Sequence, residues 1–426
     1  MISIFSENTT ERLKYVLDFC FADKGFDYKI ITRIDDWKVE KYFRINYSSL
    51  DIPADISILP SEILFKKGVE LNPIISKSEN NFLINGIKDD LGIIFWLISR
   101  YEEYGENNLD EHQRYISTNS AAAKLNFLHQ PLADILCKEI WQRIGLDYTI
   151  VKNGFELIPS FDIDVAWAYK NRKLTRNLGA AFKHGKIAER TKVWLGKEKD
   201  PYDTYDYIHD ISTKVNRIIC FALLGDWSKY DKNIHWKNDN YQSLLRSLNT
   251  LGGMGIHPSY DSYLNAEKIE EEISRLEKIV GHEVVKSRQH FLRLNFPSTY
   301  ENLIQCGIQR DFTMGYSDQV GFRAGTSFPY KFYNLRTDKI SNLLVFPFAY
   351  MDSALKDQLK LSPSQSKDLI NKLTNEVKEV GGIFMCVWHN SSINDKGEWQ
   401  GWKDVLDYTV SLFEKKEDSV FDDEFL

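Results

Sequence analysis

From Glu156 onward the chain repeats a strand, a loop and a helix, and this repeat constrains the fold more than any other feature. Near-continuous apolar runs, such as residues 218–224, are typical of strands that are buried on both faces. Helical stretches, such as residues 266–280 and 362–380, separate these runs. The strand candidates are residues 156–164, 217–225, 253–260, 282–290, 309–316, 342–352 and 382–390. The pattern predicts an α/β fold with a parallel sheet, and seven units favour a barrel slightly smaller than the eight-stranded kind.

The preceding residues, 1–152, lack this rhythm and are expected to form a smaller N-terminal α+β domain. A helix is predicted over residues 9–21, with Thr9 or Thr10 as its cap, and strand-like stretches begin at Tyr28 and Phe43. No catalytic constellation stands out here, so the role of this domain is unknown. The predicted domains are therefore residues 1–152 and a barrel over residues 153–426.

Charge and hydropathy exclude several classes of protein. A net charge of −7 and a pI of about 5.8 argue against general affinity for nucleic acid. The long apolar runs, such as residues 93–98, are too short for a transmembrane segment, which needs about 20 residues. The N-terminus does not resemble a secretory signal, and the five cysteines are widely spaced. We therefore expect a cytoplasmic protein with reduced thiols.

Charged or imidazole side chains stand at the carboxyl ends of almost all the predicted strands. They are Asp162, Asp164, Asp226, His257, Arg288, His290, Asp318, Asp352 and His389. Active sites of parallel barrels lie at this end of the strands. Three of the nine histidines in the chain occupy such positions. The ordinary polarity of loops that follow strands does not explain this concentration of histidines. The placement predicts one shared active site.

Asp162 and Asp164 are two residues apart on a predicted strand, so both side chains point to the same side. Two carboxylates held together need a compensating cation, or one of them keeps its proton. A divalent metal ion bound by one carboxylate and by imidazoles of neighbouring strands is the simplest solution. The other carboxylate can then accept a proton from a water molecule.

Four short motifs, taken in order, resemble those of the polysaccharide deacetylases, carbohydrate esterase family 4. They are S-F-D-I-D (160–164), H-P-S-Y-D (257–261), G-F-R-A-G-T (321–326) and V-W-H-N (387–390). The resemblance covers about residues 156–420 and is greatest to a bacterial branch with an extra N-terminal domain. It implies a distorted (β/α)7 barrel that hydrolyses N-acetyl groups on glycans, usually with zinc or a similar ion.

The resemblance also implies a role for each matching residue. Asp162 is similar to the catalytic base of the family, and Asp164 is similar to its metal-binding carboxylate. His257 matches the first metal histidine, Arg323 matches the arginine that orients the base, and His389 matches the general acid.

Two departures from the family pattern leave questions open. The second metal histidine of the family follows the first by four residues, and Asp261 stands there in this chain. Asp261 is therefore an alternative ligand, but we favour His290 because it ends the adjacent predicted strand. The second departure is the Gly-Thr pair after Arg323 and Ala324, where the family usually has a proline.

Further residues are expected around this centre. Asp352 ends the strand before His389 and could keep that imidazole protonated, although a loop-capping role is equally consistent with its position. Arg288 and Tyr260 are expected substrate contacts, and a backbone N–H near Tyr260 is expected to stabilise the oxyanion. The basic stretch of residues 170–199 is either a solvated helical face or a patch for an anionic membrane or a lipid-linked phosphate substrate.

These features predict a metal-dependent hydrolase that removes N-acetyl groups from an amino-sugar-containing glycan or glycan precursor, with one divalent ion, zinc by preference. The first alternative is a non-catalytic, deacetylase-like carbohydrate-binding protein. The second is a metal-independent glycosidase that uses Asp162 and another carboxylate across a sugar ring. The metal content of the purified protein separates the hydrolase from both alternatives.

Overall fold

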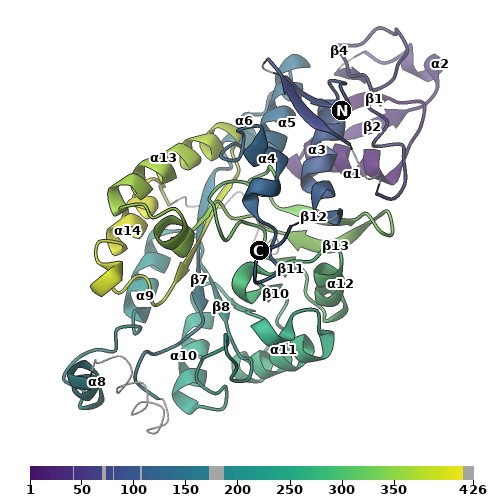
Figure 1. Ribbon diagram of the computed structural model, residues 1–426. Helices are drawn as coiled ribbons and strands as arrows, with labels where there is room; N and C mark the ends of the chain where they lie inside the picture. The colour runs from purple at the N-terminus through teal and green to yellow at the C-terminus, as the bar shows by residue number, and fades with distance from the viewer. Residues whose placement is uncertain (42, 70–72, 80, 106–107, 172–186, 416–426) are drawn as a thin grey trace.

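The computed structural model describes residues 1–41, 43–69, 73–79, 81–105, 108–171 and 187–415. Figure 1 shows a small sheet near the N-terminus at one end of the molecule and a longer sheet, flanked by helices, through the rest. One hydrophobic core cluster contains residues of both regions, from Ile2 and Val16 to Val377 and Trp402. The two regions therefore share a continuous core.

The N-terminal sheet has four strands in the order β2-β1-β3-β4, and every neighbouring pair is parallel. The strands are β1 (Ile2–Phe5), β2 (Tyr28–Ile31), β3 (Arg44–Asn46) and β4 (Ile56–Ser57). Helix α1 (Glu11–Cys20) begins where the Thr10 side chain accepts a hydrogen bond from the backbone N–H of Leu13. An antiparallel hairpin of β5 (Ile75–Ser78) and β6 (Asn81–Ile84) follows.

The apolar run of residues 93–98 forms a helix that is buried on every side. This helix, α3 (Asp90–Ile98), is capped by the Asp89 carboxylate and packs against α1 and α5. The other helices of this region are α2 (Ile34–Trp37), α4 (Ala121–Lys124), α5 (Leu132–Arg143) and α6 (Thr149–Lys152). Among the described residues, no helix has the length and apolar character needed to cross a bilayer.

The larger sheet has nine strands in the order β12-β13-β11-β10-β9-β8-β7-β15-β14. Every neighbouring pair is parallel except β12 and β13. The strands are β7 (Glu156–Ile163), β8 (Ile219–Ala222), β9 (Met254–Ile256), β10 (Lys286–Ser287), β11 (Arg310–Asp311), β12 (Tyr330–Asn334), β13 (Lys339–Val345), β14 (Tyr350–Met351) and β15 (Ile383–His389). The predicted α/β fold with a parallel sheet is confirmed.

Helices follow the strands of this sheet and bury one face each. Helix α11 runs between the cap Asn265 and Gly281, whose left-handed φ of 83° ends it. Helix α13 begins with a capping box formed by Ser362 and Gln365, and Gly381 ends it in the same conformation. The helices are α8 (Ile187–Trp194), α9 (Tyr205–Lys214), α10 (Asp239–Asn249), α11 (Ala266–Val280), α12 (Ser298–Gln305), α13 (Pro363–Val380) and α14 (Lys403–Ser411).

Short helical turns complete the chain. They are η1 (Ala22–Lys24), η2 (Tyr101–Tyr104), η3 (Ser117–Asn119), η4 (Tyr260–Ser262), η5 (His290–Leu292), η6 (Ala354–Gln358) and η7 (Gly397–Trp399). Turns η4 and η5 lie just beyond β9 and β10. Several predicted strands therefore end earlier than expected, because their last residues belong to the turns that carry the polar side chains.

Candidate metal centre and acid–base site

Asp162 at the end of β7 and His389 at the end of β15 lie on the same face of the sheet. Side chains alternate along a strand, so Ile158, Ser160 and Asp162 share a face of β7. Ile158 packs in a small cluster with Met385 and Val387 of β15. His389 lies two residues after Val387, so its side chain is on the same face of β15. Asp162 and His389 are register partners across the two strands. The apolar cluster therefore supports the strand ends that carry the carboxylates and the histidine.

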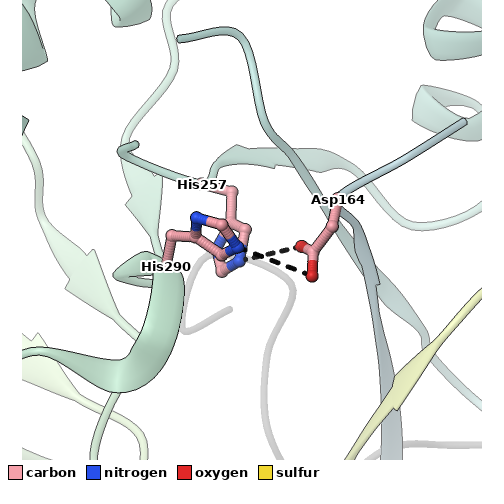
Figure 2. A group of neighbouring side chains, drawn as sticks. All are labelled: Asp164, His257 and His290. Atoms are coloured by element: carbon pink, nitrogen blue, oxygen red, sulfur yellow. Dashed lines mark ion pairs between the residues drawn. The ribbon is translucent and has the colours of Figure 1, made fainter. Parts of the chain in front are cut away.

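Three side chains from neighbouring strands form a cluster that could hold a metal ion (Figure 2). Asp164 follows β7, His257 follows β9, and His290 begins turn η5 after β10. The Nε2 atom of His257 lies 3.2 Å from Oδ1 of Asp164, and Nε2 of His290 lies 3.6 Å from Oδ2. One ligand atom from each residue lies within 4.8 Å of the other two. Both imidazoles are buried, whereas the Asp164 side chain is partly exposed.

Hydrogen bonds fix the orientation of both imidazoles. Nδ1 of His257 donates to the backbone carbonyl of Arg288 at 2.5 Å. Nδ1 of His290 donates to Oδ1 of Asp231 at 2.8 Å. Because each Nδ1 carries the proton, each Nε2 can present a lone pair toward Asp164 when the ring is neutral.

The donor set fits a small divalent cation. Oδ1 of Asp164 is buried and accepts no hydrogen bond from the described residues. Two ligands of a tetrahedral zinc ion, each at about 2.1 Å from it, lie about 3.4 Å apart. The measured separations of 3.2 and 3.6 Å bracket that spacing. One carboxylate and two imidazoles also leave a position for water or substrate.

The charges of this cluster support one another. Burial raises the pKa of the Asp164 carboxyl, but His290, His257 and His389 lower it well below its ordinary value. Burial lowers the pKa of His290, but Asp164 and Asp231 raise it to about 9. Without an ion, His290 is thus cationic at neutral pH, and a bound metal ion would replace that proton.

Asp162 is held by Arg288, which the sequence analysis had assigned to substrate contact. Nη1 of Arg288 donates to Oδ1 of Asp162 at 2.8 Å, and Nη2 donates to Oγ of Ser160 at 2.8 Å. The Arg288 side chain is fully buried beneath the site, so it fits an orienting role rather than substrate contact. Oδ2 of Asp162 lies 3.9 Å from Nε2 of His257. Oδ2 is therefore the oxygen of Asp162 that faces the cluster, while Oδ1 is bonded to Arg288.

Arg323 does not occupy the position that the resemblance implied. Its Nε donates to Oε1 of Glu103 at 2.9 Å, and its Nη1 donates to the carbonyl of Gly315 at 3.0 Å. Arg100 pairs with the same Glu103 carboxylate at 2.8 Å. Arg323 therefore belongs to a buried ion network with the N-terminal region, and Arg288 takes its expected place beside Asp162. The position of Arg288 at a predicted strand end was the available signal for this role.

His389 and Asp352 form the expected pair. Nδ1 of His389 donates to Oδ1 of Asp352 at 2.8 Å, while Nε2 lies 3.6 Å from Oδ2 of Asp164. Burial lowers the pKa of His389, but Asp352 and then Asp164 raise it to about 10. Asp352 also accepts the backbone N–H of His389 at 2.8 Å. The imidazole is cationic at neutral pH, with Nε2–H directed at the cluster.

The structure places Asp261 and Tyr260 outside the donor set. Asp261 is exposed, and its backbone N–H lies 3.4 Å from Oδ2 of Asp231. The backbone N–H of Tyr260 donates to Oδ1 of Asp231 at 2.8 Å, so it is not free to stabilise an oxyanion as expected. Asp231 itself was missed, because it lies in the loop after β8 and no motif or strand end marks it.

A cavity of about 290 Å³ opens onto these groups. Its lining residues are Arg114, Asp162, Asp164, His257, Gln289, His290, Phe291, Leu292, Met351, Ser353, His389, Ser391 and Trp399. The cavity thus joins the metal cluster, the Asp162 carboxylate and the His389 imidazole. Arg114 comes from the N-terminal region, in which no motif marks a site residue.

The basic stretch of residues 170–199 lies partly outside the described residues. Within the described part, Lys170 pairs with Asp203, Lys192 with Glu198 and Lys199 with Asp206. These pairs fit a solvated surface, and residues 172–186 lie outside the described part of the chain.

The N-terminal region matches a family model described as a family of unknown function (DUF7033), over residues 2–148. No curated protein matches the chain.

Solved structures of several enzymes are similar to part of the chain. A protein of Mycobacterium smegmatis described as a polysaccharide deacetylase is 15% identical, with a TM-score of 0.40, over 61% of this chain and 85% of that chain. One of Pseudomonas aeruginosa PAO1 with the same description is 12% identical, with a TM-score of 0.38, over 62% and 85%. A 4-alpha-glucanotransferase of Thermococcus litoralis is 14% identical, with a TM-score of 0.35, over 62% and 37%. Similarity at this level leaves the activity of the chain open.

Proposed function

We propose that this protein is a metal-dependent hydrolase that removes N-acetyl groups from an amino-sugar-containing glycan or glycan precursor. One observation carries the proposal: the cluster of Asp164, His257 and His290 shares a cavity with a carboxylate and a cationic imidazole. Such a set can serve amide hydrolysis, because water must lose a proton and the amine must gain one. The four sequence motifs that resemble polysaccharide deacetylases point to the same chemistry.

The proposal includes a sheet that closes as a distorted barrel of seven strand units. Strand β13 pairs with β11, and β14 of the same segment pairs with β15 at the other end of the parallel ladder. The backbone N–H of Phe348 donates to the carbonyl oxygen of Met314, which follows β11. The backbone N–H of Ala349 donates to the carbonyl oxygen of Met385 in β15. Adjacent residues thus bond to opposite ends of the ladder, which supports closure.

Asp164, His257 and His290 would hold one divalent ion, with zinc as the best match to one carboxylate and two imidazoles. When bound, the ion would act as a Lewis acid toward the acyl oxygen and make water more acidic. Asp162 accepts the proton of the attacking water at Oδ2, since Arg288 occupies its other oxygen.

His389 supplies the second proton. The bond between the acyl carbon and nitrogen breaks as Nε2–H of His389 protonates that nitrogen, which then leaves as a neutral amine. The hydroxyl of water stays on the acyl carbon, giving acetic acid, which loses its proton to solvent and departs as acetate. Asp352 holds the imidazole in its cationic form and aims Nε2 at the cluster.

The cavity suits a saccharide that carries a small acyl group. Phe291, Met351 and Trp399 offer apolar or aromatic surface to a sugar ring, beside the charged groups. The volume of about 290 Å³ can accommodate an N-acetyl sugar unit.

The test is acetate release from N-acetylglucosamine oligomers by protein that has been stripped with a chelator and then given zinc. We expect release only after zinc is added, and loss of release in Asp164→Ala. Asp261→Ala is the matched control, because it removes an exposed carboxylate near the same site. Sugar release without metal would instead indicate a glycosidase, and binding without any product would indicate a carbohydrate-binding protein.

A further inference from the structure

The N-terminal region reaches the metal centre through a tight loop of residues 109–115, which we call the brace loop. A bridge between Leu109 and Tyr115 closes it. Inside, the carboxylate of Asp110 accepts the backbone N–H groups of His112 at 2.9 Å and Arg114 at 2.8 Å. The loop is therefore held in one shape by its own hydrogen bonds.

The brace loop contacts the turn that carries His290. The backbone carbonyl of His112 accepts a hydrogen bond from Nε of Arg293 at 2.9 Å. Nη1 of Arg114 donates to the carbonyl of Phe291 at 3.5 Å. The rings of His112 and Phe291 meet edge to face, with centroids 4.7 Å apart. These contacts flank the residue directly after His290.

The brace loop also contacts the segment that follows His257. Nδ1 of His112 lies 3.3 Å from the hydroxyl of Tyr260, and the two rings are 5.8 Å apart. Nη1 of Arg293 donates to the carbonyl of Tyr260 at 2.9 Å, which links both segments. The brace loop thus contacts Tyr260, which follows His257, and Phe291, which follows His290.

The turn after His290 needs such support. Phe291 has a φ of 61° and Leu292 a φ of 56°. Two consecutive non-glycine residues in the left-handed region are uncommon and persist only where the surroundings fix them. The Phe291 ring is enclosed by the rings of His112, Tyr230, Tyr260 and His290.

We infer that the brace loop is a positioning element of the metal centre, with His112 and Arg114 holding the His257 and His290 segments at the separation that binds the ion. This inference rests on the proposed metal-dependent function. It gives the N-terminal region a role within the site itself, rather than that of an appended docking module. His112 and Arg114 act through other residues and are not ligands.

Zinc affinity of the full chain tests the inference without any substrate. Metal-stripped protein is titrated with zinc against a chromogenic chelator. We expect His112→Ala to weaken zinc binding by about 10–100-fold, the usual loss when support around a ligand is removed. His112→Phe keeps an aromatic ring against Phe291 and should restore most of the affinity. His129→Ala is the control, because this histidine lies in the same region and does not line the cavity.

Unchanged zinc affinity in His112→Ala overturns the inference. If His112→Ala does not fold, Arg114→Ala decides, since its partly exposed side chain contacts Phe291. Weaker zinc binding with an unchanged melting temperature of the metal-free protein supports the inference, and wild-type affinity rejects it. If the wild-type chain itself binds no zinc, the proposed function fails first and the inference falls with it.

Discussion

Nδ1 of His290 donates a hydrogen bond to Oδ1 of Asp231 at 2.8 Å, across 59 residues of sequence. Asp231 is buried and also accepts the backbone N–H of Tyr260 and the hydroxyl of Ser228. One carboxylate therefore fixes the imidazole of His290 and the start of the turn beyond His257. A carboxylate behind a histidine ligand raises its basicity and fixes its orientation.

Asp231→Asn should weaken zinc binding by about 10–100-fold, because His290 loses its anionic partner. The competition titration with a chelator measures this change. Asp226→Asn is the control and should keep wild-type affinity. Asp226 is an exposed residue of the same loop, and its carboxylate pairs with Arg275. Equal affinities in the two variants would show that Asp231 does not support the ligand.

The choice between His290 and Asp261 can be settled by metal content. His290→Ala should lose most of the bound zinc, because its Nε2 faces Asp164 at 3.6 Å. Asp261→Ala should keep the metal, because its side chain is exposed and outside the cluster. Elemental analysis of the two purified variants gives the answer, and the reverse pattern would assign Asp261 as the ligand.

The rate of deacetylation should fall on the alkaline side as His389 loses its proton. The pKa of His389 is raised to about 10, above its ordinary value, so the cation is present at neutral pH and is lost as the pH rises through that value. A bound ion will offset the part of the rise in the His389 pKa that Asp164 causes. The part that Asp352 causes will remain. Asp352→Asn should therefore move the alkaline limb of the pH–rate profile to lower pH. An unmoved limb would mean that Asp352 only caps the loop.

General acid catalysis by His389 should show in the choice of leaving group. His389→Ala should slow release from an N-acetyl amide by about 10²–10⁴-fold, because an amine leaves poorly without a proton. An activated acetate ester, whose leaving group departs as an anion, should be affected much less. Steady-state rates with both substrates make the comparison. Equal losses would assign His389 a binding role in place of proton transfer.

Two buried arginines should differ in what they control. Arg323→Gln should lower the free energy of unfolding by at most about 3–5 kcal/mol, because Glu103 keeps only Arg100 as its ionic partner. Arg288→Gln should lower the deacetylation rate through loss of the bond to Asp162. Denaturant unfolding and rate measurements on both proteins separate the two roles. Wild-type stability of Arg323→Gln would contradict the structural role.

The sequence predicted which side chains lie at the carboxyl edge of the sheet, although several strands end earlier than expected. Parallel strands bring their carboxyl ends to one edge, so Asp164, His257, His290 and His389 had to be neighbours once the repeat was recognised. The sixth strand candidate, residues 342–352, was harder, because it forms two short strands that pair with different neighbours. No local pattern distinguishes such a segment from a single strand.

The supporting residues were much less predictable, because their partners are distant in sequence. Arg323 fits a family motif, yet Glu103, 220 residues away, holds it. Arg288 reaches Asp162 across 126 residues. Only the tertiary fold decides which arginine meets which carboxylate.

The pairing of Asp162 with His389 across β7 and β15 ties the folding of the sheet to its chemistry. Backbone hydrogen bonds set the spacing of these two strands at about 4.8 Å, so the separation of the Asp162 carboxylate and the His389 imidazole depends on the ladder. A shift of β15 by one residue would turn Trp388 toward the cavity and His389 away from it. A single insertion or deletion within β15 would therefore break this pair even where the chain still folds, whereas the same change in the loops beyond would leave the pair intact.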